Sequence, residues 1–459
     1  MRKLAPPAAL DSIRPVAEAI RRRGGRALVT GGYVRDLVLG CPSEDLDVEV
    51  LGLTAPQLDA ALRGFGTVQR FGASFPVRQV EGLRAQFSLP RRDSLPVGGP
   101  EEGGVASLSF AEAARRRDLT MNAMGLDPLT DELLDPLGGR ADLQARRLRA
   151  ADPARFGDDP LRGLRVMQLA ARFEMRPDAA LVALCGQLDL EGVPGERWLP
   201  EFDKMLLLAR CPSLGLEVLR ETGLLRFFPE LGALVGVPQD PEWHPEGDVW
   251  VHTLMAVDAA ATLRCGGDRD VDLMHGVLCH DFGKPDTTRQ TDGRTTSRGH
   301  CEAGLEPTRR FLARMRASHQ RIDRVCALVE HHLAPALLDA QGATPRAYRR
   351  LARRIAAAGV APDLLESVAR ADHLGRTTAD ARARRFPAGD RFLAKLAELE
   401  LRHAPPSDVV RGRHLLARGL APGPELGVLL ERCREIQDET GSTDPEEILV
   451  RALEGRNGG

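Results

Sequence analysis

The feature that most constrains the fold of this 459-residue chain is a pair of aspartates that follows a Gly-Gly turn. Gly31 and Gly32 come directly after a short apolar run, and a helical stretch at 33–39 separates them from Asp45 and Asp47. Alternation along a strand puts the side chains of Asp45 and Asp47 on one face. The order strand, glycine turn, helix, turn, strand predicts a compact α+β domain.

These residues also indicate a chemistry. Two carboxylates on one strand face can hold Mg²⁺ through oxygen, and Mg²⁺ neutralises a triphosphate and activates an attacking hydroxyl. Gly31 and Gly32 allow backbone N–H groups to approach phosphate, and the start of the following helix favours an anion. Arg35 is expected to project from that helix towards the same place. Asp-x-Asp alone is often a solvated strand face and Gly-Gly alone is a turn, so the catalytic interpretation rests on their combination.

Further motifs follow in order along the chain, namely RRDLTMN at 116–122, DPLGG at 135–139, DDPLR at 158–162 and GER at 195–197. Together with GGYVRD and the Asp-x-Asp pair, they resemble the motifs of the tRNA CCA-adding enzyme and bacterial poly(A) polymerase family. This resemblance implies a polymerase-β-like nucleotidyltransferase head. Such a head adds CCA to tRNA 3′ ends from CTP and ATP without a nucleic-acid template, and releases pyrophosphate.

The resemblance also implies site residues. Asp45 and Asp47 would be catalytic and would bind Mg²⁺. The incoming nucleotide would be bound by a larger set, which comprises Gly31, Gly32, Arg35, Arg117, Asp118, Asn122, Asp159 and Arg162. Arg117 and Asp118 would hold its ribose and phosphates. Asp159 and Arg162, three positions apart on a predicted helix, would both face its base. The candidate RNA contacts are Arg165 and Arg197, although a solvated basic helix face accounts for Arg165 at least as well.

The sequence departs from the family pattern at two positions. Asp158 stands where the family has glutamate, which shortens the reach of the side chain. Gln86 stands where some relatives carry a third strand carboxylate, so we assign two metal ligands to the head. The segment at 91–108 is rich in Gly, Pro and charge and is predicted to be a mobile loop. Its presence favours full CCA addition without proving it.

A second group of metal-ligand residues lies in the C-terminal half and comprises His252, His280, Asp281, His300, His331, His332 and Asp372. Neighbouring residues on a helix splay by only about 100°, so His280 and Asp281 can reach one metal. Imidazole and carboxylate ligands suit Ni, Mn, Fe or Zn. The set resembles the HD phosphohydrolase superfamily, in which an all-α bundle holds one metal. His300 with His331 or His332 resembles the subset that holds two.

The HD resemblance implies that a metal-bound water attacks phosphate esters or 2′,3′-cyclic phosphates. A helical domain with surface and capping histidines, or a degenerate domain without activity, is the alternative. His244 and His275 are expected to have no ligand role, although His275 shares a predicted helix with His280 and is a candidate supporting residue.

Hydrophobic periodicity predicts a multidomain chain. We expect a nucleotidyltransferase head at 1–143, a helical neck at 144–240 that reads bases and binds tRNA, an all-α HD domain at 241–400, and a small helical tail at 401–459. Within the head, further strands are expected at 46–50, 67–71, 78–80 and 85–89.

Composition indicates a cellular location but says little about binding partners. The eight cysteines form no CxxC pair, and no apolar run reaches the roughly 18 residues that span a bilayer, so a cytoplasmic protein without membrane contact is expected. The net charge of −2 does not indicate nucleic-acid binding. Arginine clusters suit phosphate contact, but a GC-rich genome would also raise arginine. The sequence does not specify an oligomeric state.

Three other functions fit parts of the sequence. The same head occurs in poly(A) polymerases and in enzymes that add only CC or only A. The HD domain could be the working part, with the head as a binding module, but intact Asp45, Asp47, Arg117 and Asp118 argue against an inactive head. A non-enzymatic RNA chaperone that uses the arginine-rich neck is the third.

Overall fold

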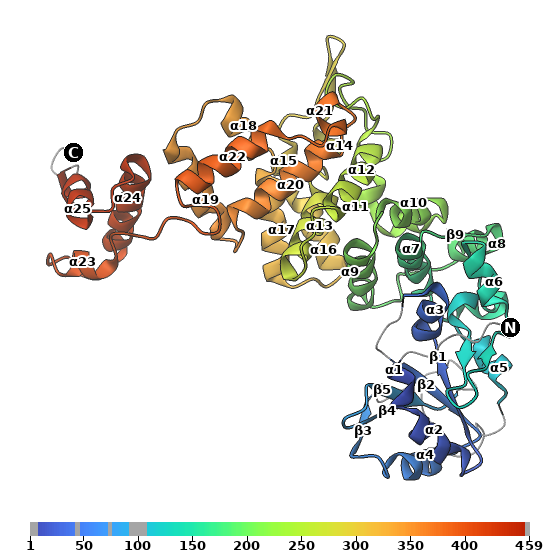
Figure 1. Cartoon of the computed structure of the whole chain (residues 1–459). Coiled ribbons are helices and arrows are strands. Elements are labelled where there is room, and N and C mark those ends of the chain that lie inside the picture. The colour runs from blue at the N-terminus through green and yellow to red at the C-terminus, as the bar shows by residue number, and fades with distance from the viewer. Residues whose placement is uncertain (1–7, 42–45, 72–75, 91–107, 455–459) are drawn as a thin grey trace. The chain divides into compact units, whose positions relative to one another are not determined.

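The computed structural model describes residues 8–41, 46–71, 76–90 and 108–454. The chain forms two compact units (Figure 1). The first comprises Met1–Val193 and Glu217–Leu224, and the second comprises Pro194–Leu216 and Leu225–Gly459. The four-part division at 143, 240 and 400 stays a prediction.

A mixed seven-stranded sheet in the order β3-β4-β5-β2-β1-β6-β7 is the centre of the first unit. The strands are β1 (Arg26–Thr30), β2 (Leu46–Leu51), β3 (Val68–Phe71), β4 (Val77–Val80), β5 (Ala85–Ser88), β6 (Gly125–Leu126) and β7 (Leu133–Leu134). Only the β2–β5 pair is parallel among these strands. The strands expected from alternation are therefore present, whereas two-residue strands such as β6 and β7 are too short to leave a periodic signal.

Helices cover this sheet and extend the first unit beyond it. They are α1 (Ala8–Asp11), α2 (Arg14–Arg21), α3 (Gly32–Leu39), α4 (Ala55–Leu62), α5 (Phe110–Ala114), α6 (Gly139–Gln144), α7 (Arg162–Phe173) and α8 (Ala179–Gly186), with 3-10 turns η2 (Thr120–Asn122) and η3 (Pro153–Asp158). In α2, Val16, Ala17 and Ile20 share one face and are buried. A capping box between Thr54 and Gln57 starts α4.

The second unit is almost entirely helical among its described residues, with one small hairpin formed by β10 (Arg289–Thr291) and β11 (Arg294–Thr296). Its helices up to the tail include α9 (Leu199–Leu208), α12 (Val249–Ala261), α13 (Asp268–Cys279), α14 (Lys284–Thr287), α15 (His300–Ala303), α16 (Leu305–Arg314), α17 (His319–His331), α19 (Pro345–Ala356) and α20 (Pro362–Leu374). α12 packs against α13 and α20, and these three helices bring distant histidines and aspartates together. The predicted α+β head followed by an all-α body is confirmed.

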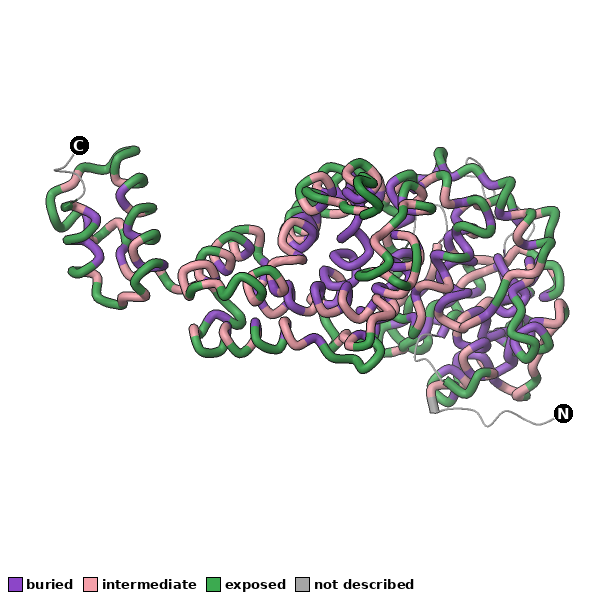
Figure 2. Tube along the Cα trace, turned by 90° about the horizontal axis from the view of Figure 1, so that it is seen from above, coloured by how far each residue is buried: buried purple, intermediate pink, exposed green. Residues whose placement is uncertain are grey.

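The last helices, α23 (Gly412–Leu416), α24 (Pro424–Thr440) and α25 (Pro445–Glu454), have a small core of their own. Figure 2 shows this separate group of buried positions near the C-terminus. Arg353 of α19 forms ion pairs with Asp408 and Asp438, which attach the tail to the helical body. Among the described residues, no helix combines the length and apolar character needed to cross a bilayer.

Candidate functional site

The Gly-Gly turn of the head brings a strand end, an arginine and a carboxylate together. Thr30, the last residue of β1, pairs with Asp47 of β2 in the antiparallel register. Gly31 follows with φ of +73°, a conformation that favours glycine. A Cβ atom at Gly31 would lie 3.1 Å from Nη1 of Arg117 and 3.8 Å from Oδ2 of Asp47. The glycine backbone therefore borders both side chains. Asp45 lies outside the described residues.

The face of β2 that carries Asp47 carries a second acid, Glu49. Oε2 of Glu49 lies 3.3 Å from Nη2 of Arg117, which also donates to Oγ1 of Thr30 at 2.8 Å. Strand alternation from Asp47 places Glu49 on the same face, which is the sequence signal for this second acid. Gln86 of β5 pairs with Asp47 in the parallel register, so this neighbouring position offers an amide rather than a carboxylate.

Arg35 is placed differently from the prediction. Its side chain is buried on α3, where Nη1 donates to Oδ1 of Asn122 at 2.9 Å and Nε donates to Asp36 at 2.8 Å. Its guanidinium also lies 4.3 Å from the ring centroid of Phe173. These contacts hold α3 against η2 and α7, and a Cβ atom at Gly32 would lie 3.4 Å from Nη2 of Arg35, so Arg35 supports the glycine turn.

Asp118 is also buried, and three groups donate to its carboxylate. The N–H of Leu119 and the amide of Asn122 donate to Oδ1, while Nε of Arg165 donates to Oδ2 at 2.7 Å. Burial opposes ionisation, but Arg165 and these donors together hold the pKa of Asp118 below its ordinary value. Arg165, a candidate RNA contact, is thus bonded to the RRD motif. The periodicity of a single helix could not reveal this pairing, because the two residues are far apart in the chain.

The prediction that Asp159 and Arg162 lie on one helix is wrong. Asp159 has extended backbone at φ −134° and ψ 103°, and its carboxylate accepts the N–H of Leu161 just before α7 begins. Arg162 is the first residue of α7, and its guanidinium donates to the carbonyl oxygens of Arg155 at 2.5 Å and Arg116 at 2.6 Å. Pro160 stands between them, and the helix starts only after the turn that this proline favours.

The remaining motifs of the head and neck lie at the start of a helix and in a 3-10 turn. The carboxylate of Asp135 accepts the N–H groups of Gly139 and Arg140, and so caps the start of α6. Arg197 ends a 3-10 turn, η4 (Gly195–Arg197), in the second unit and is exposed. It therefore stays a candidate RNA contact.

The depressed pKa of Asp118 gives a pH prediction. A carboxylate whose pKa is lower in the folded than in the unfolded state stabilises the fold above its unfolded pKa of about 3.9, and this contribution is lost as pH falls towards the folded pKa. The difference in unfolding free energy between the wild type and Asp118→Asn should therefore shrink on acidification from about pH 7 to about pH 3. Urea unfolding across this range measures it. A difference that does not vary with pH would contradict the assignment.

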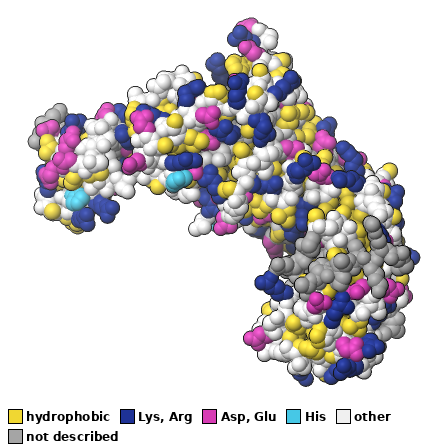
Figure 3. Space-filling view, viewed as in Figure 1, with side chains coloured by type: hydrophobic (Ala, Val, Ile, Leu, Met, Phe, Trp, Pro, Cys, Tyr) yellow, Lys and Arg dark blue, Asp and Glu magenta, His cyan; other side chains and the backbone are white. Residues whose placement is uncertain are grey.

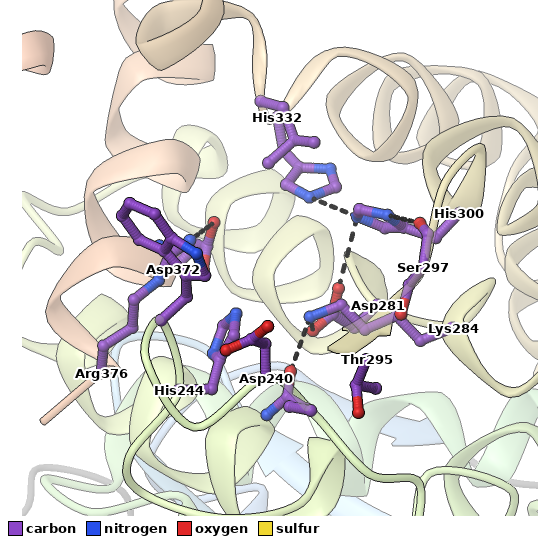
Figure 4. Close-up of a pocket in the computed structure, with 13 residues that line it drawn as sticks. Asp240, His244, Asp281, Lys284, Thr295, Ser297, His300, His332, Asp372 and Arg376 are labelled. Atoms are coloured by element: carbon purple, nitrogen blue, oxygen red, sulfur yellow. Dashed lines mark hydrogen bonds and ion pairs between the residues drawn. The ribbon is translucent and has the colours of Figure 1, made fainter. Parts of the chain in front are cut away.

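In the second unit, residues from five segments meet in a cluster that we call the histidine cluster, made of His252, His280, Asp281, His300, His332 and Asp372. Nε2 of His252 lies 3.3 Å from Nε2 of His280 and 3.1 Å from Oδ1 of Asp372. Nε2 of His300 lies 3.3 Å from Nε2 of His332. Figure 4 shows His332, His300 and Asp281 in a row with their polar atoms turned towards one another.

Three histidines of the cluster are oriented by a backbone carbonyl at the nitrogen that faces outward. Nδ1 of His280, His300 and His332 lies 2.7 to 2.8 Å from the carbonyl oxygens of Val277, Ser297 and Val329, respectively. A carbonyl oxygen only accepts, so each Nδ1 carries a proton, and in the neutral ring each Nε2 presents a lone pair to the centre. Lone pairs that face one another at 3.3 Å repel unless a cation lies between them. The arrangement is the one that metal-binding histidines adopt.

The acids of the cluster carry the complementary charge. Asp281 is buried and neither oxygen accepts a well-directed hydrogen bond, although Nζ of Lys284 lies 2.8 Å from Oδ2. Burial raises the cost of its charge, but His280 and Lys284 hold its pKa well below the ordinary value. Oδ2 faces His280 at 3.2 Å and Oδ1 faces His300 at 3.6 Å. Asp281 can therefore bridge two cations, one on each side.

Several residues around the histidine cluster differ from the sequence prediction. His331 is not part of the cluster. Neighbouring residues on a helix point about 100° apart, so His331 and His332 face different directions. Nε2 of His331 lies 3.8 Å from Oε1 of Glu330. His244 was assigned no role, yet it lines the cavity beside the cluster. Glu246 was missed, and its Oε1 lies 2.8 Å from Nδ1 of both His244 and His252. His275 bonds to Asp203 instead and stands apart.

A cavity of about 250 Å³ opens onto the cluster (Figure 4). Its walls are Gln239, Asp240, Trp243, His244, Asp281, Lys284, Thr295, Ser297, His300, His332, Leu333, Asp372 and Arg376. Lys284 is paired with Asp281 and Arg376 with Asp372, so the cationic side chains balance two acids. Divalent cations at the histidines would make the cavity positive and suited to a phosphate group. Sγ of Cys301 lies 3.8 Å from Nε2 of His300 and 3.8 Å from Nδ1 of His332. Burial raises the pKa of this thiol to about 12.

Comparison with known proteins connects the head to a family. Residues 27–149 match the family model described as the poly A polymerase head domain, and residues 179–234 match the one described as the probable RNA and SrmB-binding site of polymerase A. The chain is 37% identical over 316 residues to the multifunctional CCA protein of Halorhodospira halophila, which covers 66% of this chain and 72% of that protein.

Solved structures share the fold over nearly the whole length. The CCA-adding enzyme of Bacillus stearothermophilus in complex with CTP superposes with a TM-score of 0.68 at 20% identity, covering 98% of each chain. The Thermotoga maritima CCA-adding enzyme complexed with tRNA superposes with a TM-score of 0.61 at 18% identity, covering 99% of this chain and 97% of that one.

Proposed function

Because this chain belongs to the family of CCA-adding tRNA nucleotidyltransferases, we propose that it adds CCA to tRNA 3′ ends from CTP and ATP without a nucleic-acid template. The relative that is 37% identical carries this proposal, since its similarity spans two thirds of the chain. The grouping of Asp47, Arg117 and Gly31 at one end of the sheet supports it independently. In the reaction, the terminal 3′ oxygen bonds to the α-phosphorus, pyrophosphate leaves, and the hydroxyl proton passes to solvent.

The described residues fit a divalent metal at the head. Asp47 is an exposed carboxylate beside the glycine turn, and oxygen donors suit Mg²⁺. We propose that Asp45 and Asp47 hold the ion, which would supply charge neutralisation at the triphosphate and a more acidic 3′ hydroxyl. Arg117, held between Thr30 and Glu49, would contact the phosphates with its remaining donors.

Other side chains of the head motifs would act on the nucleotide indirectly. Asp118 is enclosed by its own donors, so we propose that it positions Arg117 by fixing the RRD segment. Arg35 and Asn122 would hold α3 and the glycine turn in place. Asp159 and Arg162 remain the proposed readers of the base. Arg162 would do so by exchanging its present carbonyl partners for the base edge.

Product length tests the proposed head activity. Purified protein would be incubated with Mg²⁺, labelled CTP and ATP, and tRNA transcripts that lack CCA, CA or A. We expect completion to CCA and then a stop, resolved at single nucleotides. A long A tail, or addition of CC only or A only, would replace CCA addition by one of the related activities. No incorporation on any acceptor would contradict the nucleotidyltransferase proposal.

For the second unit, we propose a metal-dependent phosphohydrolase. Nε2 of His252 and His280 with Asp372 would bind one transition metal, His300 and His332 would bind a second, and Asp281 would touch both. Ni, Mn, Fe or Zn suits these donors, and the bound ions would supply an acidified water. Hydrolysis of a 2′,3′-cyclic phosphate breaks one P–O bond, leaving hydroxyl on phosphorus and a proton on the released ribose oxygen.

We also propose a cytoplasmic location for both reactions. The eight cysteines are free thiols in the structure, a state that a reducing compartment maintains.

A further inference from the structure

One large aromatic side chain beside the histidine cluster is mostly exposed. Trp243 lines the cavity and is 59% exposed, whereas Trp198 and Trp250 are 5% and 1% exposed. An indole is usually buried because its surface is largely apolar. An exposed indole at the entrance of a polar cavity therefore suggests that a ligand covers it.

Trp243 lies in a turn-rich segment that precedes α12. Its turn is fixed by the N–H of Trp243, which donates to the carbonyl oxygen of Asp240 at 3.1 Å. Gln239 of the same segment accepts from Nζ of Lys284 at 2.7 Å, and Lys284 in turn lies against Asp281. The segment that carries the indole is thus connected through Gln239 and Lys284 to Asp281 of the cluster.

A substrate that fills this cavity needs a phosphate near the cluster and a flat group near Trp243. We propose that Trp243 is a nucleobase-stacking platform, and that the cavity receives the phosphorylated 3′-terminal nucleotide of an RNA chain. This inference rests on the proposed phosphohydrolase function of the cluster. Stacking on an aromatic side chain accepts any base, which suits an enzyme that acts on ends of varied sequence.

The hairpin β10–β11 supports an RNA chain rather than a free nucleotide. Thr295 and Ser297 line the cavity, while Arg289, Arg294 and Arg298 of the same segment are exposed. Figure 4 shows Thr295 and Ser297 on the side of the cavity away from Arg376, and Figure 3 shows basic side chains along the protruding hairpin. Arginines beside the entrance can bind the phosphates of the preceding nucleotides.

Steady-state hydrolysis by Trp243→Ala tests the platform. With cytidine 2′,3′-cyclic phosphate, we expect KM to rise by about tenfold or more, with kcat within about twofold of the wild type. Trp243→Phe should retain most of the affinity, since it keeps an aromatic face. Glycerol 1,2-cyclic phosphate, which has no base, should be hydrolysed equally by all three proteins. An equal rise in KM for both substrates would overturn the stacking role.

A binding measurement separates this inference from the hydrolase proposal. Cytidine 3′-phosphate should quench the tryptophan fluorescence of the full-length wild-type protein but not of Trp243→Phe, because the other two tryptophans are buried. Quenching without hydrolysis of any ester would support the platform and contradict the hydrolase. Hydrolysis without quenching by the nucleotide would support the hydrolase and contradict the stacking platform.

The hairpin is tested with a chain substrate. Replacing Arg289, Arg294 and Arg298 together by glutamine should raise KM for an oligoribonucleotide ending in a 2′,3′-cyclic phosphate by about fivefold or more at low salt. KM for the mononucleotide should be unchanged. Equal KM values for the oligonucleotide in both proteins would show that the cavity takes a free nucleotide, and would overturn the RNA-end assignment.

Discussion

Asp47→Asn is expected to lower the rate of nucleotide addition to tRNA by about 10³-fold or more, while the protein stays folded. Several kcal/mol of transition-state stabilisation come from a metal ion at a transferring phosphoryl group, and each 1.4 kcal/mol corresponds to about tenfold in rate. Asparagine keeps the size of the side chain but removes the charge that holds the cation. Because Asp47 is exposed on β2, the loss of its charge should leave the melting temperature nearly unchanged.

The rate is measured as single-turnover addition of labelled CMP, and Glu81→Gln is the matched control. Glu81 is an exposed acid of the same domain, at the turn between β4 and β5, so its substitution removes the same charge outside the site. Glu81→Gln should add nucleotides at the wild-type rate. An Asp47→Asn protein that is folded and retains more than a tenth of that rate would sink the assignment of Asp47 as a metal ligand.

Asp281→Asn is expected to abolish phosphohydrolase activity and to remove bound transition metal. Its two oxygens face His280 and His300, so one substitution weakens the ligand set of both proposed ions. The loss in kcat should again reach about 10³-fold, because the acidified water disappears with the metal. CCA addition should remain within about twofold of the wild type, since the head carries a separate ligand set.

Metal content is measured by elemental mass spectrometry on the same samples as the hydrolysis of cytidine 2′,3′-cyclic phosphate. Asp286→Asn is the matched control, because Asp286 is an exposed acid five positions along on α14. Should Asp281→Asn unfold, His300→Asn offers a second route, with the expected loss of one of the two ions. Wild-type metal content in both cluster variants would refute the proposed ligand assignment.

Local patterns were enough for the elements of the head. The apolar run, the glycine turn and strand alternation predicted β1, α3 and β2, and the observed end of β2 differs from the expected one by one residue. These features depend on neighbours along the chain, such as the positive φ at Gly31. The histidines and aspartates of the cluster were also identified from the sequence, because few residue types bind transition metals.

Local sequence patterns did not predict the directions in which side chains point. Arg35 was expected to face phosphate, but Asn122 and Phe173, distant in sequence, draw it into the interior. Arg165 appeared to be a solvated residue until the fold placed it against Asp118. Trp243 and Glu246 were missed because their roles depend on which helices surround them.

By itself the sequence determined the α+β head, the all-α body and the set of candidate ligands, because backbone preferences and ligand chemistry are encoded locally. Only the tertiary structure decided which of the adjacent His331 and His332 turns inward, and which arginines are bonded to acids rather than to solvent. These outcomes depend on how helices from distant parts of the chain pack. A buried charge is stable only beside its partner, and the partner is supplied by the fold.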